Sequence, residues 1–469
     1  MPTAAHWPCL VILAAILVPG PRAGAEDAGA AGIPAISPEE YRARRTRVLE
    51  TMLRGQSAHA VLLLTSGGRA DSPGGMEHAG SGSKDLFYLT GIGEPGAALL
   101  LAGRPVEGIG KQAVLFLEPR KEGQNRWTVP LPGTREVGAA CGIPQEAILA
   151  PERLPGILAK ALSVDSGTAP ALEPRPRLYF HAGGRTGPGE PLPEGYAFLL
   201  ARLGTAAFHL DLRDPNALLI PLRKVKSPAE IARIRRSAVI TAAALRSVIR
   251  EVRPGDFEYQ VAARIEAGFR LRGASGSSFT PIVGSGPNAC ILHYDRYDRR
   301  IAADELVLMD VGAEIEGYAA DVTRTVPASG RFTPRQKRLH DILTAAQEAG
   351  LRAVRPGATF EDVEGKVKEA VAAGLQEMGL IAGPLDVHRY LPHGTSHAVG
   401  LDVHDPVPDR RLEAGMVITL EPGIYIPEES LGLRLEDDVL VTGDGGEILS
   451  GGVPRTAEAL ERWLRPREY

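Results

Sequence analysis

The stretch ELVLMDVGAEIEGYAADVTRTV, residues 305–326, places two aspartates inside apolar, strand-like sequence. It is predicted to form two strands around a turn near Glu316-Gly317. In an antiparallel hairpin whose loop has an even number of residues, opposite positions sum to an odd number, so Asp310 and Asp321 point to the same face. Two ionised carboxylates on one face repel each other unless a cation lies between them. The alternative is a solvated face with two unrelated aspartates, but the apolar run before Asp310 is typical of an interior strand.

Two glutamates follow strand-like runs further along the chain. Glu421 ends the apolar run of MVITLEPGIYI, just before a Pro-Gly turn. In LGLRLEDDVLV, Leu433 and Leu435 alternate with Arg434 and Glu436, so Glu436 extends from a strand whose opposite face is core. A guanidinium two residues away on that face is a natural partner for a metal-bound carboxylate. Each glutamate alone would more often be an ordinary polar strand residue.

The segment HGTSHAVGLDVH carries three of the chain's 11 histidines, His393, His397 and His404. A zincin helix is excluded, because its motif needs glutamate directly after the first histidine and Gly394 occupies that place. Carboxylates with one imidazole are ligands typical of a hard, oxygen-rich site for two divalent ions. The predicted ligand set is Asp310, Asp321, His397, Glu421 and Glu436.

The remaining histidines are then free for other work. His393 and His404, with His293 in ACILHYD, are candidates for hydrogen bonding and proton transfer, because a neutral imidazole near pH 7 suits both. Two bridging carboxylates would hold the ions about 3.5–4 Å apart, the spacing of two-metal hydrolytic sites.

At 469 residues the chain exceeds the size at which one hydrophobic core usually stops growing, so two or more domains are expected. Ser37 and Ser227 each read as a helix N-cap, with proline next and glutamate three positions on. The helix that follows Ser227 is predicted to be long and to carry one apolar stripe. We therefore predict a first domain over 37–220 and a second over 221–469.

The first domain is predicted to be α/β, because strands alternate with helices. AHAVLLLT is a buried strand, and DLFYLTGIGEPGAALLL and KQAVLFLEP are also strand-like, with Gly and Pro between them. The stretch 165–195 is rich in Gly and Pro and is predicted to form loops.

The remaining composition narrows the partners and the location. A net charge of −4 without a basic block argues against nucleic acid, and three scattered cysteines suggest neither disulfides nor a thiolate metal site. Residues 1–25 have the apolar core and small-x-small end of a signal peptide, although no Lys or Arg precedes that core. The protein is expected to be exported, periplasmic or secreted, if this signal is real, and cytoplasmic otherwise. No span is expected in the mature chain.

Six segments together resemble the aminopeptidase P branch of the pita-bread metallopeptidases, family M24, which includes prolidase. They are KDLFYLTGIGEPGAALLL, FTPIVGSGPNACILHY, LVLMDVGAEIEGYAADVTRT, HGTSHAVGLDVHD, MVITLEPGIYI and LRLEDDVLV. The resemblance covers about residues 37–460. It implies a creatinase/prolidase-like α/β domain followed by a catalytic domain of curved antiparallel sheets flanked by helices.

The resemblance also implies a role for each site residue. Asp310 would bind one ion, His397 and Glu421 the other, and Asp321 and Glu436 would bridge both. The substrate-binding, proton-transferring and supporting residues would be His293, His393, His404, Tyr425 and Arg434. Glu421 would also handle the proton of the attacking water.

The implied reaction is removal of the first residue of a peptide whose second residue is proline, by a hydroxide shared between two ions. Mn²⁺ is the typical metal, with Zn²⁺ or Co²⁺ as alternatives, and a homodimer or homotetramer is expected. A prolidase restricted to dipeptides and a non-catalytic binding protein remain alternatives. One departure, the charged DRYDRR after His293-Tyr294, bears on substrate preference.

Overall fold

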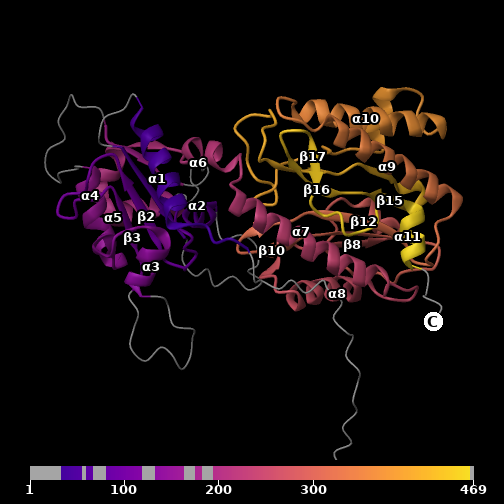
Figure 1. Cartoon of the computed structure of the whole chain (residues 1–469), viewed down its shortest axis with the longest axis horizontal. Coiled ribbons are helices and arrows are strands. Elements are labelled where there is room, and N and C mark those ends of the chain that lie inside the picture. The colour runs from indigo at the N-terminus through magenta and orange to yellow at the C-terminus, as the bar shows by residue number, and fades with distance from the viewer. Residues whose placement is uncertain are drawn as a thin grey trace, which may run out of the picture. The chain divides into compact units, whose positions relative to one another are not determined.

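The computed structural model describes residues 33–54, 60–66, 81–118, 133–162, 175–181 and 194–464 (Figure 1). The predicted signal peptide, residues 1–25, lies outside these ranges. None of the helices in the described residues has the length and apolar character that crossing a membrane requires.

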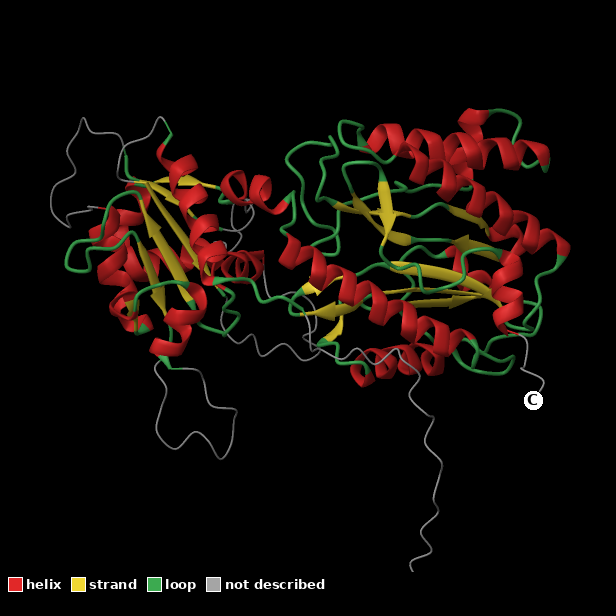
Figure 2. Ribbon diagram, viewed as in Figure 1, coloured by secondary structure: helices red, strands yellow, loops and turns green. Residues whose placement is uncertain are grey.

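The N-terminal region is a six-stranded mixed sheet with helices packed against it (Figure 2). Its strand order is β4-β3-β2-β1-β5-β6, with antiparallel pairs β1–β2 and β2–β3 and parallel pairs elsewhere. The strands are β1 (Ala60–Thr65), β2 (Ala98–Ala102), β3 (Ala113–Phe116), β4 (Ile148–Leu149), β5 (Arg177–Tyr179) and β6 (Asp211–Arg213). The helices are α1 (Pro38–Leu53), α2 (Ser81–Thr90), α3 (Thr134–Cys141), α4 (Leu154–Leu162), α5 (Glu194–Leu203) and α6 (Asn216–Arg223).

Strand β1 is apolar from Ala60 to Leu64 because both of its faces are covered. Leu62 and Leu64 pack in the cluster that contains residues of α1 and α2, whereas Val61 and Leu63 pack with residues of α4. A strand buried on both faces reads as a continuous apolar run rather than an alternating one. The strand predicted from AHAVLLLT is therefore present.

Two expectations for this region are wrong. DLFYLT belongs to helix α2, not to a strand, and the helix ends before Gly91, which has a φ of 72° and donates its N–H to the Phe87 carbonyl. A short apolar run looks the same in a buried helix and a buried strand, so its periodicity could not separate them. The stretch predicted as loops also contains β5, which pairs with β1 and β6.

The C-terminal region consists of antiparallel sheets flanked by helices (Figure 2). The larger sheets are β12-β9-β8 and β13-β16-β17, and smaller ones are β11-β10-β7 and β14-β15. The strands are β7 (Gly276–Ser277), β8 (Ile282–Ser285), β9 (Leu306–Val311), β10 (Ala313–Ile315), β11 (Tyr318–Ala319), β12 (Val322–Pro327), β13 (Val417–Leu420), β14 (Gly423–Ile426), β15 (Leu431–Arg434), β16 (Asp437–Val441) and β17 (Gly446–Ile448). The helices are α7 (Pro228–Ile249), α8 (Glu258–Leu271), α9 (Pro334–Ala353), α10 (Phe360–Glu377) and α11 (Ala457–Leu464).

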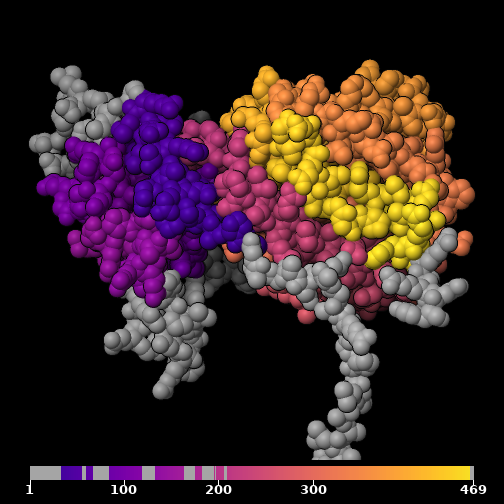
Figure 3. Space-filling view, viewed as in Figure 1, coloured from indigo at the N-terminus to yellow at the C-terminus, as the bar shows by residue number. Residues whose placement is uncertain are grey.

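Helix α7 begins where the sequence predicts. The Ser227 hydroxyl accepts from the Glu230 N–H, and the Glu230 carboxylate accepts from the Ser227 N–H, which completes a capping box. The C-terminal half of its apolar stripe, including Leu245 and Val248, is buried in one core with residues of α8, α9, α10, β9 and β12, whereas Ile234 and Ala238 pack in the cluster that contains residues of α1 and α2. On the face shown in Figure 3, the yellow C-terminal residues lie between this helix and the orange residues of α9 and α10. The predicted fold class is confirmed.

Candidate metal centre

The two aspartates of the predicted hairpin share a face. In the β9–β12 pair, Asp310 lies opposite Thr323, so Asp321 is the diagonal neighbour of Asp310 on the same side. The turn is at Glu316 and Gly317, which have φ values of 49° and 82°. Parity correctly predicted the shared face, while the true register is offset by two residues from a direct pairing of the aspartates.

A close contact of main-chain atoms fixes the hairpin between these aspartates. A Cβ on Gly312 would lie 1.7 Å from the Ala320 carbonyl oxygen, so only glycine is accommodated. Ser278 ties both sides together, because its N–H donates to the Gly312 carbonyl and its hydroxyl donates to the Ala320 carbonyl, each at 2.8 Å. The approach of the two strands is therefore set by the backbone.

The side chains form three overlapping groups of potential ligands, and within each group one ligand atom per residue lies within 4.8 Å of the others. Each of three side chains, Asp321, His397 and Glu436, belongs to two of the groups. Together the groups contain every predicted ligand, Asp310, Asp321, His397, Glu421 and Glu436, and also His404. Of the three shared side chains, the carboxylates Asp321 and Glu436 offer two oxygens each and could bridge a pair of neighbouring cations.

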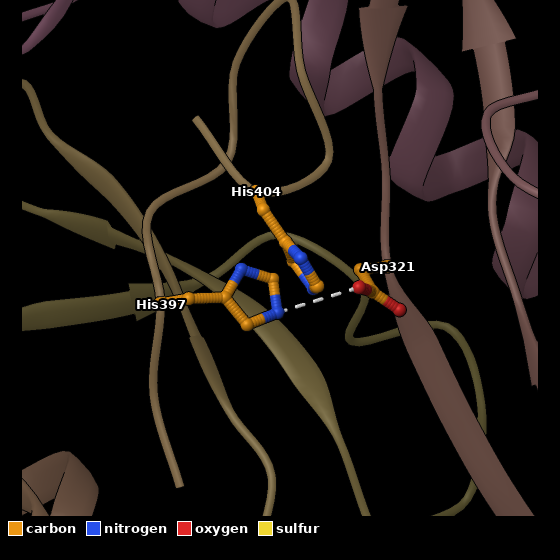
Figure 4. A group of neighbouring side chains, drawn as sticks. All are labelled: Asp321, His397 and His404. Atoms are coloured by element: carbon orange, nitrogen blue, oxygen red, sulfur yellow. Dashed lines mark ion pairs between the residues drawn. The ribbon is translucent and has the colours of Figure 1, made fainter. Parts of the chain in front are cut away.

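These side chains come from segments far apart in the sequence. Asp310 is near the end of β9, Asp321 precedes β12, Glu421 directly follows β13, and Glu436 lies between β15 and β16. The imidazole of His397 lies beside Asp321 (Figure 4), and the distance from its Nε2 to Oδ2 of Asp321 is 3.5 Å. The strand ends, together with the loop that carries His397, therefore place all of these groups at one point.

The electrostatics of the cluster call for cations. Burial raises the pKa of Asp321 and of Glu436 well above the usual range, and neighbouring carboxylates raise both further. Burial also raises the pKa of Glu421 to about 7. One oxygen each of Asp310 and Asp321 is buried without a hydrogen-bond partner. Buried carboxylates without donors are costly, and the residues present fit two divalent ions.

Arg434 supplies positive charge on one side of the cluster. Its Nη2 donates to Asp310 at 2.7 Å and its Nη1 donates to the Tyr425 hydroxyl at 2.7 Å. The same hydroxyl lies 3.0 Å from Nε2 of His393. The arginine therefore orients one predicted ligand directly and one predicted substrate-binding histidine through a tyrosine.

Sequence reasoning missed two residues that hold Glu436. The Thr323 hydroxyl donates to the Glu436 carboxylate at 2.6 Å. The fully buried Arg324 donates to the Glu436 main-chain carbonyl at 2.6 Å and pairs with Asp437 at 2.7 Å. Thr323 could have been found, because it follows Asp321 by two residues on the same face.

A cavity of about 240 Å³ opens onto the cluster. Its lining is Leu292, His293, His393, Gly394, Ser396, His397, His404, Glu421 and Arg434. Burial lowers the pKa of His393 and of His404 to about 4, so both imidazoles are neutral near pH 7. The rings of His397 and His404 are 4.3 Å apart between centroids. All four predicted histidines therefore face one space beside the carboxylates.

Two family models match the chain, and together they define its class. The model "Metallopeptidase family M24" matches residues 232–443, which contain all of the predicted ligands. The model "Aminopeptidase P, N-terminal domain" matches residues 41–167, within the mixed sheet region. Fold and site thus define an M24 metallopeptidase with an aminopeptidase P N-terminal domain.

Individual relatives agree with this class over nearly the whole chain. The Xaa-Pro aminopeptidase of Escherichia coli is 34% identical over 91% of this chain and 97% of its own length. Human Xaa-Pro aminopeptidase 3 is 29% identical, with 92% of this chain and 86% of its own length covered. The chain belongs to the aminopeptidase P family.

Solved structures show the same architecture. The structure of Pseudomonas aeruginosa aminopeptidase PepP superposes with a TM-score of 0.79 at 29% identity, covering 92% of this chain and 98% of that one. A variant of E. coli aminopeptidase P in complex with substrate gives a TM-score of 0.76 at 31% identity, with 92% and 99% covered. The family resemblance expected from the six motifs is confirmed.

Proposed function

We propose that the protein is a metal-dependent Xaa-Pro aminopeptidase that hydrolyses the bond between an N-terminal residue and a proline in the second position. The observation that carries the proposal is the set of five ligand side chains in overlapping groups, two of which share Glu436. Its support is the similarity to Xaa-Pro aminopeptidases over 91% of the chain.

Asp310, Asp321, His397, Glu421 and Glu436 would hold two divalent ions. Such ions supply an acidified water and a Lewis acid for the substrate carbonyl. Glu421 lies at the cavity wall and is placed to accept the proton of the attacking water. We assign His404 to the developing oxyanion. His293 and His393, which line the same cavity, are available to bind the peptide and to protonate the leaving proline nitrogen.

The resident metal is proposed to be Mn²⁺, because the ligands are mostly carboxylate oxygens; Zn²⁺ and Co²⁺ suit the same donors. The deciding experiment removes metal with a chelator, reloads each ion separately and compares hydrolysis of Xaa-Pro-Xaa tripeptides with Xaa-Pro dipeptides. Tripeptide cleavage after the first residue is expected. Cleavage of dipeptides alone would indicate a prolidase, and stoichiometric metal without hydrolysis of either would indicate a binding protein.

Two further properties are proposed from the family resemblance and the N-terminal sequence. The protein is expected to be a homodimer or homotetramer, which light scattering during size-exclusion chromatography tests. Residues 1–25 are expected to be removed during export, which N-terminal sequencing of protein from the periplasm or medium tests.

A further inference from the structure

One buried carboxylate outside the metal cluster organises the segment that carries His293. Glu258 is the first residue of α8 and is fully buried. Its Oε1 accepts from the Ser285 N–H at 2.7 Å and from the Ser285 hydroxyl at 2.8 Å. The Asn288 amide donates to the same oxygen at 3.1 Å. These donors precede His293 in the sequence.

The other carboxylate oxygen of Glu258 holds the residues that follow His293. Its Oε2 accepts from the Tyr294 hydroxyl at 2.7 Å and from the Arg299 N–H at 3.2 Å. The main chain adds a bond, because the Glu258 N–H donates to the Arg299 carbonyl at 3.1 Å. One side chain thus fastens both ends of the segment 285–299, and His293 lies between them.

This segment forms part of the wall of the site. Leu292 and His293 line the cavity beside the metal cluster. The Tyr294 ring packs in a buried cluster with Tyr425, whose hydroxyl contacts both Arg434 and His393. A displacement of the segment would therefore move His293 relative to the cavity and loosen the packing around Tyr425.

We propose that Glu258 is a positioning residue, which sets the place of His293 through the segment 285–299 without touching the metal ligands. The inference rests on the proposed function, because it assigns His293 to substrate. Glutamine at this position would keep the shape of the side chain but direct an NH₂ group at donors. A shift of about 1 Å in a group that contacts the substrate costs on the order of 10²-fold in rate.

The test is a double-mutant cycle on hydrolysis of an Xaa-Pro-Xaa peptide. Glu258→Gln is expected to lower kcat/KM by about 10²-fold and to leave Mn²⁺ stoichiometry and affinity unchanged. In a His293→Ala background, Glu258→Gln is expected to have much less additional effect, because the group that it positions is gone. Glu251→Gln, at an exposed position shortly before α8, is the matched control and should match the wild type.

Equal kcat/KM for Glu258→Gln and the wild type would overturn the inference, as would the same fold-loss in both backgrounds. If the wild type hydrolyses no proline-second peptide, it is the proposed function that fails. Should Glu258→Gln not fold, Tyr294→Phe replaces it in the cycle, because it removes one donor to Glu258 and keeps the packed ring. A smaller loss that disappears in the His293→Ala background is then expected, and no loss or an additive loss would overturn the inference.

Discussion

Two clusters of buried acidic side chains in this molecule differ in how their negative charge is balanced. In the carboxylate cluster of the candidate metal centre, four acidic side chains, Asp310, Asp321, Glu421 and Glu436, are accompanied by one guanidinium. In a second set of residues, which we call the boundary cluster, acids and bases alternate. It consists of Asp85, Asp402, Asp405, Lys84, Arg223 and Lys226.

The boundary cluster is neutralised from within. Arg223 contacts Asp402 and Asp405 at 2.5 Å and Asp85 at 3.0 Å, and Lys226 contacts Asp405 at 3.0 Å. Burial opposes ionisation of Asp402, but Arg223 and Lys84 more than offset it and hold the pKa of Asp402 below its usual value. In the carboxylate cluster, by contrast, the pKa values of Asp321, Glu421 and Glu436 are raised. The comparison shows which cluster needs cations from solution.

The largest effect is expected from removing a shared carboxylate. Asp321→Ala and Glu436→Ala should each lower hydrolysis of Xaa-Pro-Xaa peptides by at least about 10³-fold, the scale on which essential groups act. Each should also abolish binding of the second ion, measured by metal analysis and isothermal titration calorimetry. Asp444→Ala, at an exposed position, is the control. Full turnover in either variant would refute the ligand assignment.

In the boundary cluster the loss of one carboxylate should damage the fold. Asp405→Asn leaves Arg223 and Lys226 buried with too little negative charge, and is expected to lower the free energy of unfolding by about 3–5 kcal/mol. Urea denaturation measures the change. Asp409→Asn removes an exposed partner of Lys224 and should cost at most about 1 kcal/mol. Equal effects of the two variants would show that the boundary cluster is not a matched set of charges.

In the carboxylate cluster, an Asp→Asn substitution should raise the free energy of unfolding and not lower it. Asp321→Asn removes one of several mutually repelling groups, so at pH 8 the metal-free variant should be more stable than the metal-free wild type. Urea denaturation in the presence of a chelator measures this difference. A metal-free Asp321→Asn protein less stable than the wild type would mean that the carboxylates do not repel one another.

The smallest expected effect is that of pH on the stability of the metal-free protein and on its affinity for metal. Because the pKa of Glu421 is raised to about 7, the metal-free folded protein binds more protons than the unfolded chain between about pH 4.5 and 7. Its stability should therefore rise as the pH falls through 7, whereas the depressed pKa of Asp402 contributes stability that is lost only in strong acid. Ions compete with the proton on Glu421, so metal affinity should fall about fivefold, or ~1 kcal/mol, from pH 7 to pH 6. Calorimetric titrations at both pH values test it; unchanged affinity would contradict it.

Several parts of the fold and of the candidate metal centre could be predicted from local sequence patterns. The shared face of Asp310 and Asp321 follows from strand parity alone, and the start of α7 follows from its capping residues. Leu433 and Leu435 are buried, as their alternation with Arg434 and Glu436 predicts, although Glu436 itself lies in a break between β15 and β16 and not within one strand. These predictions depend on the two-residue period of a strand and the 3.6-residue period of a helix, both of which can be read directly from the sequence.

The rest depends on partners that are distant in the sequence. Glu258 contacts residues 27 to 41 positions away, and Arg324 contacts Asp437 113 positions away, so no local pattern marks either one. Helix α2 contains the segment DLFYLT, which is too short for its apolar pattern to distinguish a helix from a strand. The pairing of Arg223 with Asp405, 182 positions away, likewise cannot be predicted from a local pattern.

Gly312 has a consequence for how this site tolerates change over time. Since its backbone touches the opposite strand, the gap between the first two acidic ligands is dictated by peptide groups. Hydrophobic residues around the hairpin can therefore be exchanged for others of similar size without altering that gap. The spacing between these two ligands is thus expected to be unaffected when core side chains are substituted.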